Sequence, residues 1–118
     1  MMEKLIQEIR EFAGKRDWQQ FHTPKNLAMA LSVEASEIVE IFQWLTGEQS
    51  RKLSPEKVAN LEEEIGDVMI YLACLADKFN MNPLEAARKK MMINEKRYPV
   101  HLARGSAKKY DELTEIKK

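Results

Sequence analysis

Residues 55–79 read PEKVANLEEEIGDVMIYLACLADKF, and this stretch decides the fold class. Its apolar residues recur every three or four positions, which is the period of an α-helix with one buried face. On a helical wheel, the stripe that should be buried consists of Leu61, Ile65, Val68, Leu72, Leu75 and Phe79. Ser54 and Pro55 are typical of a helix start, because a capping side chain is followed by proline in the first turn. The stretch therefore predicts a long amphipathic helix.

The same start signal occurs twice more, at Thr23-Pro24 and at Asn82-Pro83. Each precedes a stretch of helical periodicity, and the first residues of the chain show the same period. The predicted helices cover residues 2–15, 24–45, 55–79 and 83–98. Strand-like alternation is hard to find. We therefore expect an all-α protomer that resembles a four-helix bundle, with a single domain over residues 1–110 and a disordered charged tail over residues 111–118.

The composition excludes several functional classes. The 118 residues suffice for one domain, and 44% apolar and 32% charged residues are ordinary shares for a globular protein. Lysine plus arginine equal aspartate plus glutamate at 19 each, so the basic excess of a nucleic-acid-binding protein is missing. No segment resembles a membrane span or a signal peptide, and Cys74 is the single cysteine. We expect a cytoplasmic protein that binds neither nucleic acid nor membranes.

The second and third predicted helices carry acidic residues on the side that should be buried. On the second helix, Glu34 lies in the middle of the apolar stripe and Glu37 lies at its edge. On the third helix, Glu64 and Asp67 lie together on one shoulder of the stripe, beside Tyr71. Burying an ionised carboxylate without a partner is costly. Each helix thus presents a carboxylate pair that needs a compensating charge.

Three explanations of these acids are open. The carboxylates pair with lysine or arginine side chains of another helix, they point to water through a groove, or they hold a cation between them. Oxygen ligands select hard divalent ions. No histidine accompanies the acids, which argues against zinc and against the Glu-x-x-His pattern of di-iron bundles. The pattern favours a site for Mg²⁺, with Mn²⁺ as a possible substitute, and its ligands would be Glu34, Glu37, Glu64 and Asp67.

The amino-acid sequence around these acids resembles that of a known protein family. Glu34-x-x-Glu37 followed by Glu64-x-x-Asp67 is similar to the acidic signature of the MazG-like all-α nucleotide pyrophosphohydrolases. Over roughly residues 5–113 the chain resembles the dCTP pyrophosphatase branch of that family. The further motifs that match are DWxQFH (17–22), FQW (42–44), GDVxIYL (66–72), NxxRYP (94–99) and HLARGS (101–106).

The resemblance implies an assembly and a reaction. It implies a homodimer or a dimer of dimers, with active sites shared between subunits. It implies Mg²⁺-dependent hydrolysis of a deoxynucleoside triphosphate, dCTP or a modified dCTP, to the monophosphate and pyrophosphate, which cleanses the nucleotide pool. The connection 46–54 looks shorter than in the animal enzymes of this branch, and this difference affects the expected substrate choice.

The second and third predicted helices also carry apolar residues on the face opposite the core stripe, which agrees with such an assembly. Met29 and Val33 lie opposite the core stripe of the second helix, and Ile70 and Cys74 lie opposite that of the third helix. A helix that is apolar on nearly all sides is buried on nearly all sides, and in a short chain another copy is the simplest cover. The open alternative is that the fourth helix covers these residues.

Under this resemblance the metal ligands are also the catalytic residues, namely Glu34, Glu37, Glu64 and Asp67. Phosphate oxygens also need positive partners. Lys90 and Arg97 share one face of the fourth helix and are candidates, with Asn94 between them as a further substrate-binding residue. The alternative for the two basic residues is a solvated or salt-bridged surface.

Aromatic residues are candidates for the base and sugar pocket. Trp18 and Trp44 are expected at the base, because aromatic faces stack on nucleobases, although tryptophans near helix ends also serve in cores and interfaces. Tyr71 is expected beside the sugar. His22 is expected to bond the base or a phosphate, or to have a structural role alone.

Two other functional classes remain open. A helical metal phosphohydrolase that acts on a different phosphate bond would release orthophosphate instead of pyrophosphate. A non-catalytic helical interaction protein would consume no nucleotide at all. The residues alone do not select the preferred base.

Overall fold

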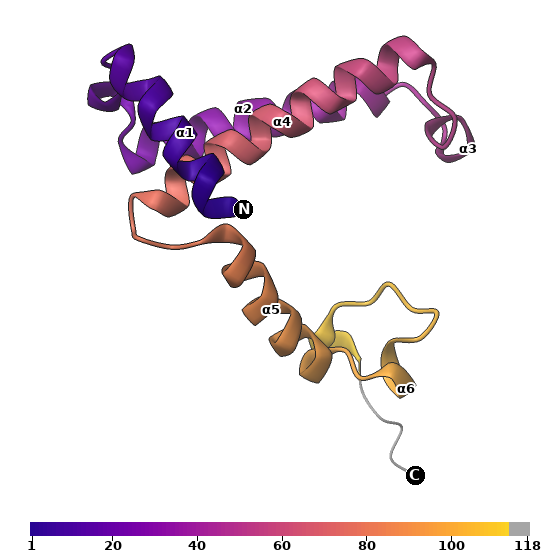
Figure 1. Cartoon of the computed structure of the whole chain (residues 1–118). Coiled ribbons are helices and arrows are strands. Elements are labelled where there is room, and N and C mark those ends of the chain that lie inside the picture. Colours follow the sequence, from indigo (N-terminus) through magenta and orange to yellow (C-terminus); the bar gives the residue numbers. More distant parts are fainter. Residues whose placement is uncertain (114–118) are drawn as a thin grey trace. The chain divides into compact units, whose positions relative to one another are not determined.

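The computed structural model describes residues 1–113, which contain helices and no strand (Figure 1). The expected all-α class is confirmed. Four helices are long: α1 (Met2–Lys15), α2 (Pro24–Phe42), α4 (Pro55–Asp77) and α5 (Pro83–Arg97). The short elements are the helices α3 (Gly47–Ser50) and α6 (Val100–Ala103) and the 3-10 turns η1 (Gln19–Phe21) and η2 (Tyr110–Glu112). Among the described residues, no helix is long and apolar enough to cross a membrane.

The chain divides into two compact units, Met1–Pro83 and Leu84–Lys118. The expectation of one domain over residues 1–110 stays a prediction. The predicted tail falls partly on η2, while residues 114–118 lie outside the described residues. The candidate metal site lies in the first unit.

Capping side chains start the helices where the sequence predicts. The Thr23 hydroxyl accepts the Asn26 backbone N–H at 3.2 Å, and the Ser54 hydroxyl accepts that of Lys57 at 3.3 Å. These bonds satisfy donors that the first turn of a helix leaves without a partner. The connection 46–54 is not a plain loop, because it contains α3, which begins with a reciprocal capping box between Thr46 and Gln49.

Two helices end in left-handed turns. Asp17 after α1 and Asn80 after α4 have φ angles of 54° and 56°. The following amides reach back into the helices, with Trp18 N–H donating to Ala13 O at 3.0 Å and Met81 N–H donating to Ala76 O at 3.0 Å. This is the hydrogen bonding of a Schellman motif, in which asparagine and aspartate tolerate the positive φ better than most residues. Both α1 and α4 therefore stop sharply. The predicted helix ends at residues 45 and 79 are too late, because α2 ends three residues earlier, at Phe42, and α4 ends two residues earlier, at Asp77.

Helices α2 and α4 pack side by side, and α1 packs against the C-terminal part of α4 (Figure 1). The buried side chains of the described residues are Ile6, Ala13, Leu27, Ala73 and Cys74. Small residues on both sides of the α1–α4 contact allow the helices to approach closely. Cys74 is thus covered within the first unit, next to α1. An ion pair between Arg10 and Asp77, with Nε to Oδ2 at 2.8 Å, joins the same two helices.

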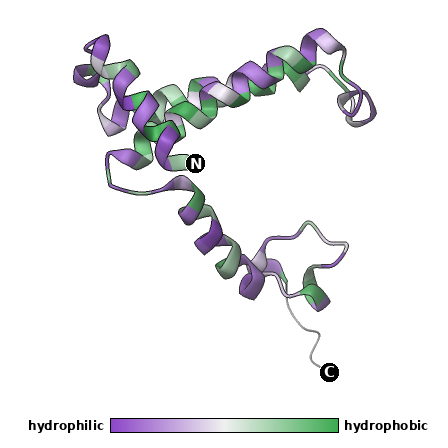
Figure 2. Ribbon diagram, viewed as in Figure 1, coloured by the Kyte–Doolittle hydropathy of each residue, from purple (hydrophilic) through white to green (hydrophobic). Residues whose placement is uncertain are grey.

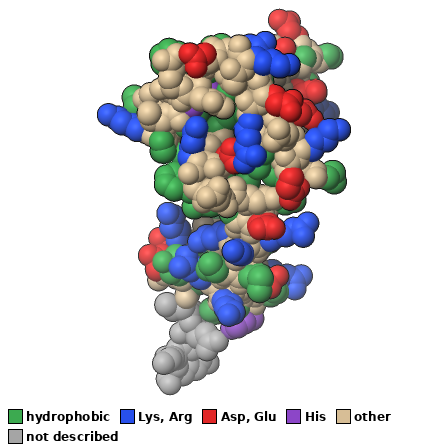
Figure 3. Space-filling model, turned by 60° about the vertical axis from the view of Figure 1, so that its left-hand side comes forward, with side chains coloured by type: hydrophobic (Ala, Val, Ile, Leu, Met, Phe, Trp, Pro, Cys, Tyr) green, Lys and Arg blue, Asp and Glu red, His purple; other side chains and the backbone are tan. Residues whose placement is uncertain are grey.

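Large apolar side chains stay exposed along the helix pair. Figure 2 shows apolar residues recurring along α2 and α4, and Figure 3 shows apolar side chains at the surface among charged ones. Met29 and Val33 of α2 are 58% and 56% exposed. The predicted buried stripe of α4 is wrong in part, because Ile65, Leu72 and Phe79 are 51%, 38% and 57% exposed within this protomer. A lone water-soluble protomer seldom presents so much apolar surface on its central helices.

Candidate metal and substrate site

The packing of α2 against α4 brings three of the four predicted acids together. Glu34 and Glu37 lie almost one turn apart on α2, and Glu64 faces them from α4. One carboxylate oxygen of each residue lies within 4.8 Å of the others, and all three side chains are half-buried. The acids therefore converge from two helices, as the wheel positions predict.

The electrostatics of this group are unfavourable without a cation. One oxygen of Glu34 and one of Glu64 are buried without a hydrogen-bond partner among the described residues. A hydrogen bond with Glu37, burial and the neighbouring carboxylates raise the pKa of Glu64 to about 7. Burial and the charge of Glu37 also raise the pKa of Glu34. Like charges held this close favour a shared proton or a bound cation.

Asp67 lies beside the three-carboxylate group rather than in it. Its side chain is exposed on α4, almost one turn after Glu64. Its charge helps to raise the pKa of Glu34. The phenol of Tyr71 is also near, because burial first, and then the charges of Glu34 and Asp67, raise its pKa. Tyr71 therefore remains a neutral hydrogen-bond donor next to the acids.

We expect the metal-free protein to become less stable as the pH rises from 4.5 to about 7. Over this range the folded chain keeps a proton on Glu64 that the unfolded chain loses, so the free energy of unfolding falls with each step up in pH. Thermal unfolding in chelator at pH 5 and pH 8 should show wild type matching Glu64→Gln at the lower pH and melting at a lower temperature than Glu64→Gln at the higher pH. A constant difference between the two proteins would contradict the shifted pKa.

Trp44 and two unpredicted residues line a cleft next to the acids. The cleft has a volume of about 390 Å³. Its walls are formed by Glu37, Glu40, Ile41, Trp44, Leu45, Lys57, Asn60 and Glu64. Trp44 is 86% exposed, so its indole is available for stacking. Lys57 and Asn60 were not predicted, although their spacing of seven and four residues from Glu64 was visible in the sequence.

Trp18 and His22 lie at the other end of α2. Nineteen residues of helix, about 28 Å at 1.5 Å per residue, separate that end from the Trp44 end. The Trp18 ring packs edge-on against Phe12 and against His22, with centroids 5.6 and 6.5 Å apart. The two tryptophans of one protomer therefore do not border the same base.

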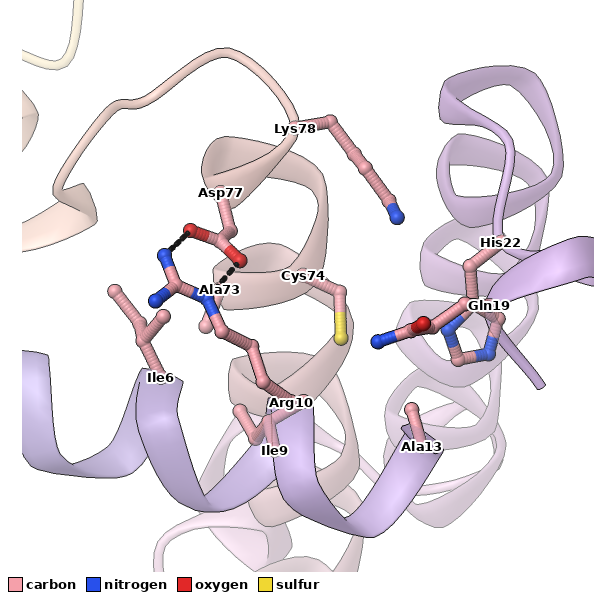
Figure 4. A pocket seen from close by; sticks show the side chains of 10 residues that line it. All are labelled: Ile6, Ile9, Arg10, Ala13, Gln19, His22, Ala73, Cys74, Asp77 and Lys78. Carbon is pink, nitrogen blue, oxygen red and sulfur yellow. Dashed lines mark hydrogen bonds and ion pairs between the residues drawn. The ribbon is translucent and has the colours of Figure 1, made fainter. Parts of the chain in front are cut away.

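His22 borders a separate pocket of about 160 Å³ between α1, the η1 segment and the end of α4 (Figure 4). Gln19 and His22 point into it from one side, Cys74 points into it from α4, and Lys78 points into it from the residue after α4. Burial and then the charge of Lys78 lower the pKa of His22. The imidazole is therefore neutral at pH 7, which disfavours it as a cationic phosphate ligand.

The two predicted phosphate-binding residues, Lys90 and Arg97, and the predicted substrate-binding residue Asn94 belong to the second unit. Lys90, Asn94 and Arg97 lie on α5 at spacings of four and three residues, so they share one helical face. The Arg97 guanidinium lies 4.4 Å from the centre of the Tyr110 ring within that unit. Their role toward the substrate stays a prediction.

Comparison with known proteins assigns the family. The MazG-like family model matches residues 29–113. Human dCTP pyrophosphatase 1 is 48% identical over 117 residues, covering 94% of this chain and 69% of that protein, and the bovine protein of the same name is 45% identical with the same coverage. The crystal structure of a pyrophosphatase from Archaeoglobus fulgidus is similar with a TM-score of 0.78 and 44% identity, covering 83% of this chain and 92% of that one. The resemblance inferred from the motifs is thereby confirmed, and the chain belongs to the MazG-like family.

Proposed function

We propose that this protein is a Mg²⁺-dependent nucleoside triphosphate pyrophosphohydrolase that converts dCTP or a modified dCTP to the monophosphate and pyrophosphate. The observation that carries the proposal is the convergence of Glu34, Glu37 and Glu64 within 4.8 Å. Relatives named dCTP pyrophosphatase 1 support the substrate class. Cleansing of the nucleotide pool in the cytoplasm is the corresponding biological role.

The donor set fits a hard divalent ion. It consists of carboxylate oxygens, and two of these oxygens, on Glu34 and Glu64, are buried without a hydrogen-bond partner among the described residues. Mg²⁺ prefers oxygen ligands, and Mn²⁺ accepts the same set. Glu34, Glu37 and Glu64 would hold the ion, and Asp67 would join them as a fourth ligand or hold a second ion.

The reaction needs a nucleophile, a proton acceptor and charge neutralisation. Water attacks the α phosphorus, the bond from that phosphorus to the α–β bridging oxygen breaks, and pyrophosphate leaves with the bond's electron pair. Mg²⁺, when bound, neutralises charge on the triphosphate oxygens. A carboxylate of the group accepts the proton that the attacking water loses. In a substrate whose phosphates were held through an ion on Glu64 and Asp67, the sugar would come close to the neutral Tyr71 phenol.

We also propose that the active protein is a homodimer or a dimer of dimers. Met29, Val33 and Ile65 are more than half exposed although they lie on the central helices. Trp18 and Trp44 lie at opposite ends of α2, so both can border one base only if a second copy supplies one of them. On α5 we propose Lys90 and Arg97 as phosphate-binding residues and Asn94 as a further substrate-binding residue.

We expect the full-length protein with Mg²⁺ to release pyrophosphate and dCMP from dCTP in equal amounts, and chelator to stop the reaction until Mg²⁺ or Mn²⁺ is restored. A panel of dCTP, 5-methyl-dCTP, dTTP and dUTP, analysed for monophosphate, pyrophosphate and orthophosphate, measures this. Release of orthophosphate instead would indicate a phosphohydrolase of another bond preference. No loss of any nucleotide would favour a non-catalytic interaction protein.

A further inference from the structure

A polar stripe runs along α4 beyond the predicted acids. Lys57, Asn60, Glu64, Asp67 and Tyr71 follow one another at spacings of three, four, three and four residues. Residues at these spacings lie on one face of a helix. The stripe thus has a cationic end, a carboxylate centre and an aromatic end.

Lys57 is the cation that lines the cleft beside the acids. The cleft also contains the carboxylates of Glu37, Glu40 and Glu64, so its wall is otherwise acidic. Within residues 1–113 no carboxylate oxygen lies within 4.0 Å of the Lys57 ammonium, since the ion pairs there involve other residues. The side chain is exposed and is therefore available to a ligand in the cleft.

The order of groups along the stripe matches the order of groups in a nucleoside triphosphate. The nucleoside is the part that an aromatic side chain contacts, the α phosphate lies in the middle, and the β and γ phosphates carry most of the negative charge. With the α phosphate at Glu64 and the sugar at Tyr71, the β and γ phosphates point toward Asn60 and Lys57. Lys57 lies seven residues, or about 10 Å along the axis, from Glu64, and its long side chain shortens that gap.

We propose that Lys57, assisted by the amide of Asn60, binds the β and γ phosphates and so holds the pyrophosphate leaving group; the inference rests on the proposed function. Negative charge builds up on the pyrophosphate as the α–β bond breaks, so a fixed ammonium interacts more strongly with the leaving group than with the intact substrate. In this orientation Trp44 of the same protomer lies at the pyrophosphate end, and its predicted stacking role would serve the site of a second copy.

The test is Lys57→Met in the full-length protein. Loss of one charge-assisted contact should lower kcat/KM for dCTP about ten- to a hundredfold and weaken the binding of magnesium pyrophosphate, measured by calorimetry, by a similar factor. The affinity for dCMP and the ranking of dCTP against dTTP should not change, because the nucleoside lies at the other end of the stripe.

Two control variants accompany it. Lys52→Met removes the same charge from a neighbouring hollow that Lys57 also borders but that contains none of Glu34, Glu37 and Glu64, and it should bind pyrophosphate like wild type. Lys57→Arg keeps the charge and should retain most of the pyrophosphate affinity.

Each contrary outcome has a distinct meaning. Unchanged pyrophosphate affinity in Lys57→Met, with a wild type that does release pyrophosphate from dCTP, overturns the role of Lys57 and leaves the proposed function intact. A changed base ranking or a weakened dCMP affinity would place the nucleobase in this cleft beside Trp44 and also overturn the inference. A wild type that releases no pyrophosphate from any nucleotide refutes the proposed function itself.

Discussion

Glu64→Gln should lower the rate of pyrophosphate release from dCTP by at least about a hundredfold at saturating Mg²⁺. The substitution keeps the shape of the side chain and removes the negative charge at the centre of the group that Glu64 forms with Glu34 and Glu37. A hard cation then has one carboxylate fewer, and the triphosphate loses part of the neutralisation that the reaction needs. The measurement is the initial rate of pyrophosphate release together with the rise in melting temperature on adding Mg²⁺.

A matched control separates this effect from damage to the helix. Glu62 lies on the same helix with its side chain exposed, outside the acidic group, so Glu62→Gln makes the same chemical change elsewhere. It should behave like wild type. Glu64→Gln should fold at least as stably as wild type in chelator at pH 8, because the substitution relieves repulsion between carboxylates. Near-wild-type turnover in Glu64→Gln would remove Glu64 from the proposed site.

Met29→Lys should dissociate the proposed oligomer and lower activity with it. Met29 is 58% exposed on α2, so lysine is tolerated in an isolated protomer. In an interface the same ammonium would be buried without a partner, at a cost of about 3 kcal/mol or more, which weakens association about a hundredfold or more. Light scattering over a range of protein concentrations, combined with turnover at each concentration, measures both quantities.

Met29→Leu is the corresponding control, since it keeps an apolar side chain of similar volume. It should assemble and turn over dCTP like wild type. If wild type is itself a monomer at every concentration, or if monomeric Met29→Lys is fully active, the proposal of sites completed by a second copy is wrong.

Much of the helical order was predictable because its signals are local. At Thr23-Pro24 and Ser54-Pro55 a hydroxyl accepts a backbone N–H of the first helical turn, and the proline that follows favours the helical backbone. These signals need no distant contact, and both helices start where expected. The convergence of Glu34, Glu37 and Glu64 was predictable for a related reason. The faces of α2 and α4 that pack against each other carry these acids among apolar residues, so the packing brings the acids together.

Other features depend on information that periodicity does not contain. The helix α3 is a single turn, too short to show a repeat. The burial of Cys74 depends on where α1 packs against α4, which no local pattern specifies. Lys57 could not be predicted as a site residue, because an exposed lysine on a polar helix face is ordinary. Only the packing of α4 against α2 makes that face the wall of a cleft.

The connection between α2 and α4, residues 46–54, can change in length without moving the carboxylates. Glu48 and Gln49 of α3 border a hollow of about 480 Å³ that shares Leu45 and Lys57 with the cleft. The spacing of the acids depends on the packing of α2 against α4 farther along the pair. Insertions or deletions in residues 46–54 can therefore change the width of the entrance at Lys57 and leave the spacing of the carboxylates unchanged.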